Sequence, residues 1–107
     1  MTLFTIPSKT VGETIPVVFN FQGKLQYGES LNGNSVTCVL YSGTDPSPGN
    51  MISGAATMTA TTVTQSITGG MAGNLYTLVC IGTGTGSHNY SMECRIAVIT
   101  PGGAYAV

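Results

Sequence analysis

The clearest pattern in the chain is the stretch Tyr90-Ser91-Met92-Glu93-Cys94-Arg95-Ile96-Ala97-Val98. Every second residue from Tyr90 to Val98 is apolar, and the residues between them are polar, charged or small. Side chains of a β-strand point alternately to its two faces, so this alternation places one face in a core and the other in water. The stretch therefore predicts a half-buried β-strand.

Further strands are predicted at 14–21, 35–41, 56–67 and 75–81, where Thr, Val, Ile and Tyr dominate. In 56–67 the residues expected on the buried face change from even-numbered to odd-numbered positions. This change predicts two short strands separated by a bulge or tight turn at Thr61-Thr62. The segment 75–81 is apolar on both faces. That pattern is typical of a central strand with both faces covered, or of a strand with one face against a neighbouring subunit.

Turn-forming residues separate these strands, and no segment has the spacing of an amphipathic helix. This pattern predicts an all-β fold, an Ig-like β-sandwich of six to seven short antiparallel strands, with a small β-barrel as the alternative. The length corresponds to a single domain over residues 1–107. The end segments 1–9 and 101–107 have no strand pattern and are candidates for extended arms that become ordered on a partner.

Charged residues are scarce. Asp, Glu, Lys and Arg make up 7% of the chain, against roughly 25% in an ordinary soluble domain. The 3 basic residues cannot form the basic stripe that binds nucleic acid, so no nucleic-acid partner is expected. No apolar run approaches the roughly 18 residues of a membrane span, and no secretory signal is visible, so no membrane partner is expected either. A neutral polar surface of this kind suits packing against other proteins.

The three cysteines, Cys38, Cys80 and Cys94, match neither the spacing of a zinc site nor a dense disulfide framework. One interpretation is three reduced thiols that are buried as small hydrophobic groups. The other is a Cys38–Cys80 bridge between the two sheets, as in antibody domains, which requires an oxidising compartment. No feature of the sequence indicates such a compartment.

Groups that could carry out catalysis are few. A Cys–His pair of His88 with Cys80 or Cys94 needs an exposed thiol, whereas Cys94 belongs to the apolar set of its strand. Glu13 and Glu29 could form a carboxylate pair for glycoside hydrolysis. Each of them, however, follows a glycine and precedes a hydroxyl residue, which is more typical of a turn before a strand. We therefore expect no enzyme activity, no catalytic residues, no cofactor and no metal site.

Exposed aromatic side chains are the natural anchors of protein–protein contacts. Anchor candidates where exposed are the five tyrosines Tyr27, Tyr41, Tyr76, Tyr90 and Tyr105; Tyr76 and Tyr90 lead core-facing sets, and Tyr41 and Tyr105 are the better candidates for contact with a partner. The loop 42–50 is rich in Gly, Pro, Ser and Asp and is a second candidate region. The predicted partner-contact residues are Tyr41, Asp45, Pro46 and Tyr105.

Several segments together match a known pattern. They are Gly28-Glu29-Ser30-Leu31, Ser35-Val36-Thr37-Cys38, Ile52-Ser53-Gly54, Thr61-Thr62-Val63-Thr64-Gln65-Ser66-Ile67 and, most distinctively, Thr68-Gly69-Gly70-Met71-Ala72-Gly73-Asn74-Leu75-Tyr76-Thr77-Leu78. In these segments the chain resembles small bacteriophage virion proteins with an Ig-like fold, in particular the fiber–tail adaptor group. The resemblance covers residues 28–100, and the first 27 residues depart from the usual start of that group.

The resemblance implies a passive structural role, joining or decorating virion components, usually in rings or trimers. We therefore expect an adaptor that joins tail, fiber or head components, with tail, fiber, portal, neck or major capsid proteins as partners. The same resemblance implies a homo-oligomer located in the virion after assembly in the host cytoplasm. The alternatives are a capsid decoration protein that stabilises the head shell and, from another class, an adhesin-like module that binds a carbohydrate or a receptor.

Overall fold

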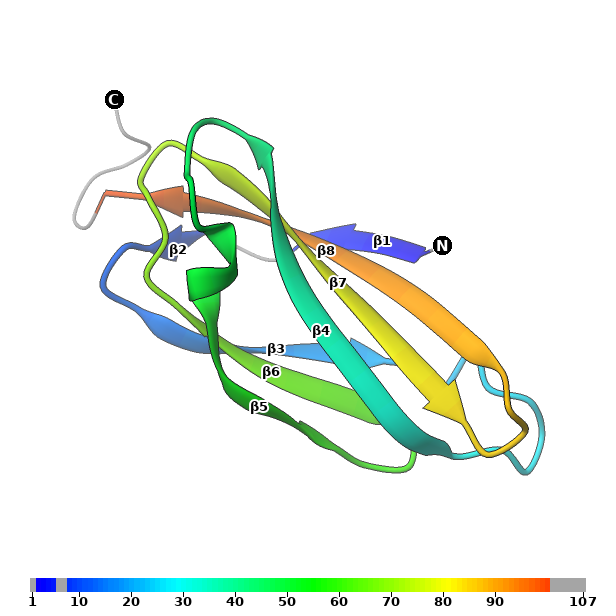
Figure 1. Cartoon of the computed structure of the whole chain (residues 1–107). Helices are drawn as coiled ribbons and strands as arrows, with labels where there is room; N and C mark the ends of the chain where they lie inside the picture. The colour runs from blue at the N-terminus through cyan, green and yellow to red at the C-terminus, as the bar shows by residue number, and fades with distance from the viewer. Residues whose placement is uncertain (1, 6–7, 101–107) are drawn as a thin grey trace.

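Two β-sheets pack face to face in the structure, a computed structural model that describes residues 2–5 and 8–100 (Figure 1). The first sheet has the strand order β1-β8-β7-β4, with β2 also paired to β8, and the second has the order β3-β6-β5. A short 3-10 helix, η1, connects β4 to β5. The bounds are β1 Thr2–Thr5, β2 Lys9–Thr10, β3 Thr14–Asn20, β4 Leu31–Ser42, η1 Pro48–Met51, β5 Ile52–Met58, β6 Thr62–Thr68, β7 Leu75–Gly84 and β8 Asn89–Ile99.

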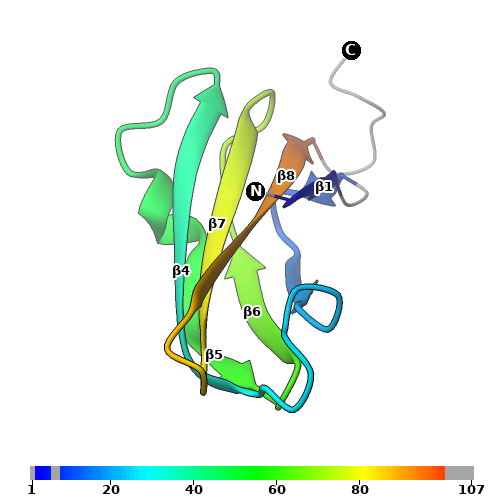
Figure 2. The ribbon, with the colours of Figure 1, turned by 90° about the vertical axis from the view of Figure 1, so that its right-hand side faces the viewer.

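The strand order is that of an Ig-like β-sandwich. In Ig domains strands B, E and D share one sheet, and C, F and G share the other. Here β3, β6 and β5 correspond to strands B, E and D, and β4, β7 and β8 correspond to strands C, F and G (Figure 2). Because the strands form two separate sheets and not one closed sheet, the predicted sandwich is confirmed and the barrel alternative is wrong.

The N-terminal segment differs from the sequence-based expectation. An extended arm is predicted over residues 1–9, but β1 and β2 both pair with β8, and they do so in parallel. The described residues therefore form eight strands, not six or seven, and two of them are not antiparallel. Pairing along a sheet edge uses backbone groups, which leave no side-chain pattern in so short a segment. The other predicted arm, 101–107, lies outside the described residues.

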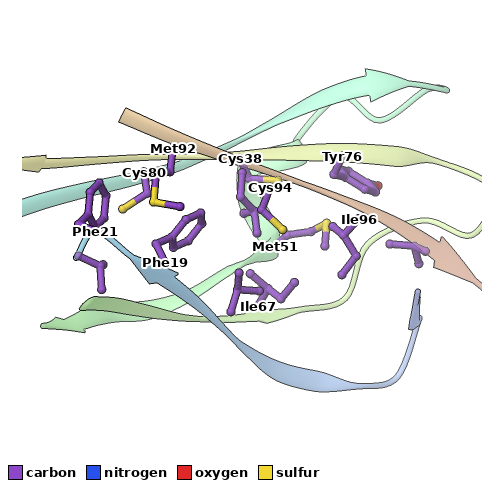
Figure 3. Packing of buried hydrophobic residues seen from close by; sticks show 14 of the residues in the cluster. Phe19, Phe21, Cys38, Met51, Ile67, Tyr76, Cys80, Met92, Cys94 and Ile96 are labelled. Carbon is purple, nitrogen blue, oxygen red and sulfur yellow. The ribbon is translucent and has the colours of Figure 1, made fainter. Parts of the chain in front are cut away.

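The core lies between the sheets and consists of the side chains that the alternation assigned to it. Val17 and Phe19 of β3, and Phe21 directly after it, are at most 1% exposed. The apolar side chains of β8 face them from the other sheet. Figure 3 shows Phe19 and Phe21 close to Cys80 and Met92. The polar residue Gln65 also lies in the core, where its amide nitrogen donates to the carbonyls of Ser53, Gly54 and Ser66 beside the irregular part of β5.

Lys9 is a buried cation that joins β2 to the turn between β6 and β7. Its side chain is fully buried, and its Nζ donates to the carbonyl oxygens of Gly69 at 2.6 Å, Thr10 at 2.8 Å and Val11 at 3.3 Å. Burial lowers the pKa of Lys9, and the nearby Glu13 carboxylate opposes this shift. The amine is thus enclosed by backbone acceptors, which fixes β2 against the turn between β6 and β7.

The three cysteines are free and buried, which agrees with the first of the two interpretations. Cys38 on β4 and Cys80 on β7 belong to neighbouring strands of the same sheet, so a bridge between sheets, as in antibody domains, is wrong for this pair. Burial raises the pKa of Cys80 to about 12 and that of Cys94 to about 11. Burial and the Asp45 carboxylate raise the pKa of Cys38 to about 11.

Because these thiols are buried and protonated, we expect them to be unreactive in the folded protein. An aromatic disulfide reagent at pH 8 should label none of them in buffer and all 3 after unfolding without reductant. Rapid labelling of the folded protein would contradict the burial. Fewer than three reactive thiols after unfolding would show that a disulfide exists.

Candidate functional site

Tyr76 closes one end of the sandwich by means of a buried hydroxyl. Its side chain is fully buried, and its hydroxyl donates to Asp45 Oδ2 at 2.7 Å. The same oxygen accepts from the Met71 backbone N–H at 2.9 Å and from Asn74 Nδ2 at 3.3 Å. This is the arrangement of a tyrosine corner, in which a tyrosine near the start of strand F bonds back to the preceding turn. We call Asp45, Met71, Asn74 and Tyr76 the Tyr76 corner.

The Tyr76 corner holds the loop after β4 as well as the turn before β7. Asn74 Nδ2 donates to the Thr44 carbonyl at 2.9 Å, and the Thr44 N–H donates to Asn74 Oδ1 at 3.3 Å. The other oxygen of Asp45 accepts from the Ser47 N–H at 2.9 Å. Asp45, a predicted contact residue, thus has both carboxylate oxygens engaged within the chain, whereas Pro46 beside it is exposed.

Gly70 explains why the turn before β7 is rich in glycine. Its φ is +92°, a conformation that residues with a Cβ rarely adopt. A Cβ at this position would lie 2.8 Å from Val98 Cγ2 and 3.2 Å from Met51 Sδ. Backbone conformation therefore favours glycine at Gly69, Gly70 and Gly73, which all have positive φ, and close packing adds to this at Gly70.

Glu29 performs the equivalent function at the opposite end. Its Oε1 accepts from the Gln26 N–H at 3.0 Å and the Tyr90 hydroxyl at 2.7 Å. Its Oε2 accepts from the Gly86 N–H at 3.1 Å and lies 3.3 Å from His88 Nδ1. The carboxylate side chain is only 5% exposed. We call these five residues the Glu29 clamp, and it ties the loop 21–30 to the hairpin between β7 and β8.

The hydrogen bonds of the clamp favour an ionised Glu29. They lower the pKa of Glu29 to about 2, the Gln26 N–H contributing most, the Tyr90 hydroxyl next, and His88 and Gly86 less, while burial opposes the shift. The alternative of a Glu13–Glu29 pair for glycoside hydrolysis is wrong, because the two carboxylates lie at opposite ends of β6. Glu13 precedes Thr14, which pairs with Thr68, whereas Leu31, two residues after Glu29, bonds to Ala60.

Tyr27, which is not among the selected contact residues, lies next to the Glu29 clamp and is fully exposed. It occupies a tight turn in which the Glu29 N–H donates to the Gln26 carbonyl at 2.9 Å. His88, across the clamp, has a side chain that is 51% exposed. The sequence signal for this exposed position is the glycine that follows Tyr27, because glycine is typical of tight turns. In the structure Gly28 has a φ of +79° and forms part of the turn.

Tyr41, a predicted contact residue, lies on the outer face of the first sheet. It is 55% exposed, and the Arg95 guanidinium carbon lies 3.7 Å from its ring centroid, a cation–π contact. Arg95 Nε also donates to Thr77 Oγ1 at 3.4 Å. The structure thus separates the predicted contact residues, with Tyr41 on a sheet face and Pro46 in an end loop. Tyr105 lies outside the described residues.

In 2–5 and 8–100, no group of three or more His, Cys, Asp or Glu side chains could hold a metal ion. In the same ranges, no helix has the length and apolar character needed to cross a membrane. His88 contacts Glu29 and not a thiol. No protein-family model and no curated protein matches this chain.

Replacing Tyr76 with Phe should destabilise the domain by about 1–3 kcal/mol, because the Met71 N–H and the Asp45 carboxylate lose a buried partner. Urea unfolding followed by circular dichroism measures this change. Tyr41→Phe is the matched control, and it should change the free energy of unfolding by less than about 0.5 kcal/mol because that side chain is exposed. Equal effects of the two substitutions would contradict the role of the Tyr76 hydroxyl.

Acid should weaken the Glu29 clamp in a defined pH range. The pKa of Glu29 is lowered on folding from 4.5 to about 2, so its stabilising contribution is present above pH 4.5 and is lost as the pH falls through about 2. Urea midpoints measured from pH 6 to pH 2 should therefore fall more steeply in the wild-type protein than in Glu29→Gln.

Glu93→Gln is the control for the loss of one negative charge. It removes a carboxylate from the outer face of β8, away from both end loops. Its urea midpoints should follow the wild-type pH dependence more closely than those of Glu29→Gln. If Glu29→Gln and the wild-type protein have the same pH dependence, the low pKa of Glu29 is incorrect.

Proposed function

We propose that this chain is a structural protein of a bacteriophage particle, an adaptor that joins tail, fiber or head components by protein–protein contacts. The observation that carries the proposal is the character of the surface. Only 7 of 107 residues are charged, yet large apolar side chains such as Val18, Tyr27 and Tyr41 are more than half exposed. A neutral surface with exposed aromatic groups suits stable contacts with other proteins.

The fixed end loops support the same role. The Tyr76 corner and the Glu29 clamp hold the loops at the two ends in defined positions, with Pro46 exposed at one end and Tyr27 at the other. A contact surface that is already ordered loses less conformational entropy when it binds. A protein that joins two components needs two such surfaces, and the sandwich presents them about one strand length apart.

The resemblance to phage adaptors supplies the biological setting of the proposal. The segments that carry it have identifiable roles in the fold, because 68–78 builds most of the Tyr76 corner and Glu29 in 28–31 forms the centre of the clamp. These segments are therefore architectural. They support a shared Ig-like framework, and the virion role is inferred from the group that uses this framework.

A second candidate function, binding of a carbohydrate or receptor, is favoured by one observation. Tyr27 is fully exposed beside the half-exposed His88 at one end of the sandwich. An exposed aromatic ring next to polar groups can stack on a sugar ring. If the protein binds a carbohydrate or receptor, Tyr27 is part of that ligand site and not an anchor for a virion protein.

The proposal is tested on purified particles of the phage that encodes the chain. Mass spectrometry should detect the protein in the particles, and cryo-electron microscopy should place its density at a junction between tail, fiber or head components. Density spread over the head shell would instead indicate the decoration protein. Absence of the chain from purified particles would contradict any virion role.

A Tyr27→Ala variant separates the adaptor from the ligand-binding module. If Tyr27 anchors a virion protein, the variant should fold normally and be depleted from particles when it replaces the wild-type chain. Val18→Ala, at an exposed apolar position on the outer face of the second sheet and away from both end loops, is the control and should be incorporated as the wild-type protein is. A glycan-array signal that disappears in Tyr27→Ala, with normal incorporation into particles, would favour the second candidate.

A further inference from the structure

The two outer faces of the sandwich differ in character. On the second sheet, the outward residues of β6 include the hydroxyl residues Thr64, Ser66 and Thr68, and Thr64 is the residue paired with Val18 of β3. On the first sheet, the outward residues of β4 and β7 include Val39, Tyr41 and Ile81, which are 48%, 55% and 41% exposed. Val39 and Tyr41 are successive outward residues of β4, and Ile81 lies farther along the same face on β7. Exposed apolar groups that share one face of a sheet indicate a contact surface. We call the outer face of the first sheet the β4–β7–β8 face.

The β4–β7–β8 face carries one acidic and one basic residue on neighbouring positions of β8. Glu93 and Arg95 are two residues apart, so both point outward. Within the described part of the chain, neither of them forms an ion pair, since the ion pair found there joins His88 to Glu29. The Arg95 guanidinium instead lies over the Tyr41 ring. The face therefore has one unpaired charge of each sign beside an apolar strip.

The strand register determines which residues of two copies would face each other. Cys38, Leu78 and Cys94 stand in one row across β4, β7 and β8. The next row on one side is Val39, Thr77 and Arg95, and the next row on the other side is Thr37, Val79 and Glu93. Consider a two-fold axis that lies between two copies of the face, perpendicular to the strands and along the row of Cys38. This axis places each of the two neighbouring rows opposite the other row of the second copy.

Two copies related by that axis would fit each other in charge, and Val39 of one copy would lie opposite Thr37 of the other. Glu93 of one copy would lie opposite Arg95 of the other, and the reverse pair would form at the same time. Ile81 would lie opposite Leu75 of the other copy, since these residues are three positions from the central row on opposite sides. In a two-fold interface each contact occurs twice, so one acid and one base on each copy satisfy both pairs.

We propose that the β4–β7–β8 face binds the same face of a second copy of this chain, with the strands of the two sheets antiparallel and Glu93 opposite Arg95. Two sheets packed face to face in this way cross at about 30° because each is twisted. Sequestering Val39, Tyr41 and Ile81 from water supplies the driving force, and the charge pairs set the register. This inference concerns self-association and stands apart from the virion role.

Sedimentation equilibrium of the purified full chain tests the proposal through charge reversal. The wild-type protein should form dimers at micromolar concentration. Glu93→Arg and Arg95→Glu should each weaken dimerisation by about tenfold or more, because like charges then face each other. An equimolar mixture of the two variants should regain dimers, since each face then meets one of opposite charge. A monomeric wild-type protein at about 100 µM, or a mixture that stays monomeric, would overturn the proposal.

A second set of variants does not depend on the charges. Val39→Thr with Ile81→Thr should weaken dimerisation, whereas Val18→Thr on the opposite outer face should not. Thermal unfolding verifies that each variant is folded. Loss of dimers in Val18→Thr, or full dimerisation of the Val39→Thr/Ile81→Thr variant, would place the contact elsewhere and overturn the proposal.

Discussion

The buried hydroxyl of Tyr76 is the constraint on which the arrangement of the domain most depends. A phenol at the core of a small sandwich is stable only if its hydroxyl finds partners. Here the partners are the Asp45 carboxylate, the Met71 N–H and the Asn74 amide, which come from the two connections that flank the sheets at this end. Meeting this one requirement therefore positions a long loop and a glycine-rich turn, and Glu29 does the same for the loops at the other end.

The few charged groups of the chain serve mainly internal purposes. Lys9 is enclosed by backbone carbonyls, Asp45 bonds to Tyr76 and Ser47, and Glu29 accepts four polar contacts. Their use inside the fold leaves an outer surface of hydroxyl and apolar side chains, on which Glu93 and Arg95 form an isolated pair of positions. A surface of this composition is suited to stable packing against protein, which is the basis of both the proposed virion role and the proposed contact between copies.

The sequence predicted what side-chain alternation can encode. The core faces of β3, β6 and β8 follow directly from the two-residue period, and the switch at Thr61-Thr62 lies where β5 gives way to β6. Parallel pairing of β1 and β2 could not be predicted, because backbone hydrogen bonds along a sheet edge leave no trace in so few residues. The Glu29 clamp was missed because its members lie about 60 residues apart in the chain and only the folded sandwich brings them together.

The central claim is that buried polar contacts hold the end loops as firmly as pairing holds the strands. Amide hydrogen exchange followed by NMR measures this directly, residue by residue. The backbone amides of Met71 and Gly86 donate to the Tyr76 hydroxyl and to the Glu29 carboxylate, so they should exchange about as slowly as the amides of β7. Exchange of both amides at the rate of an unstructured peptide would contradict the account.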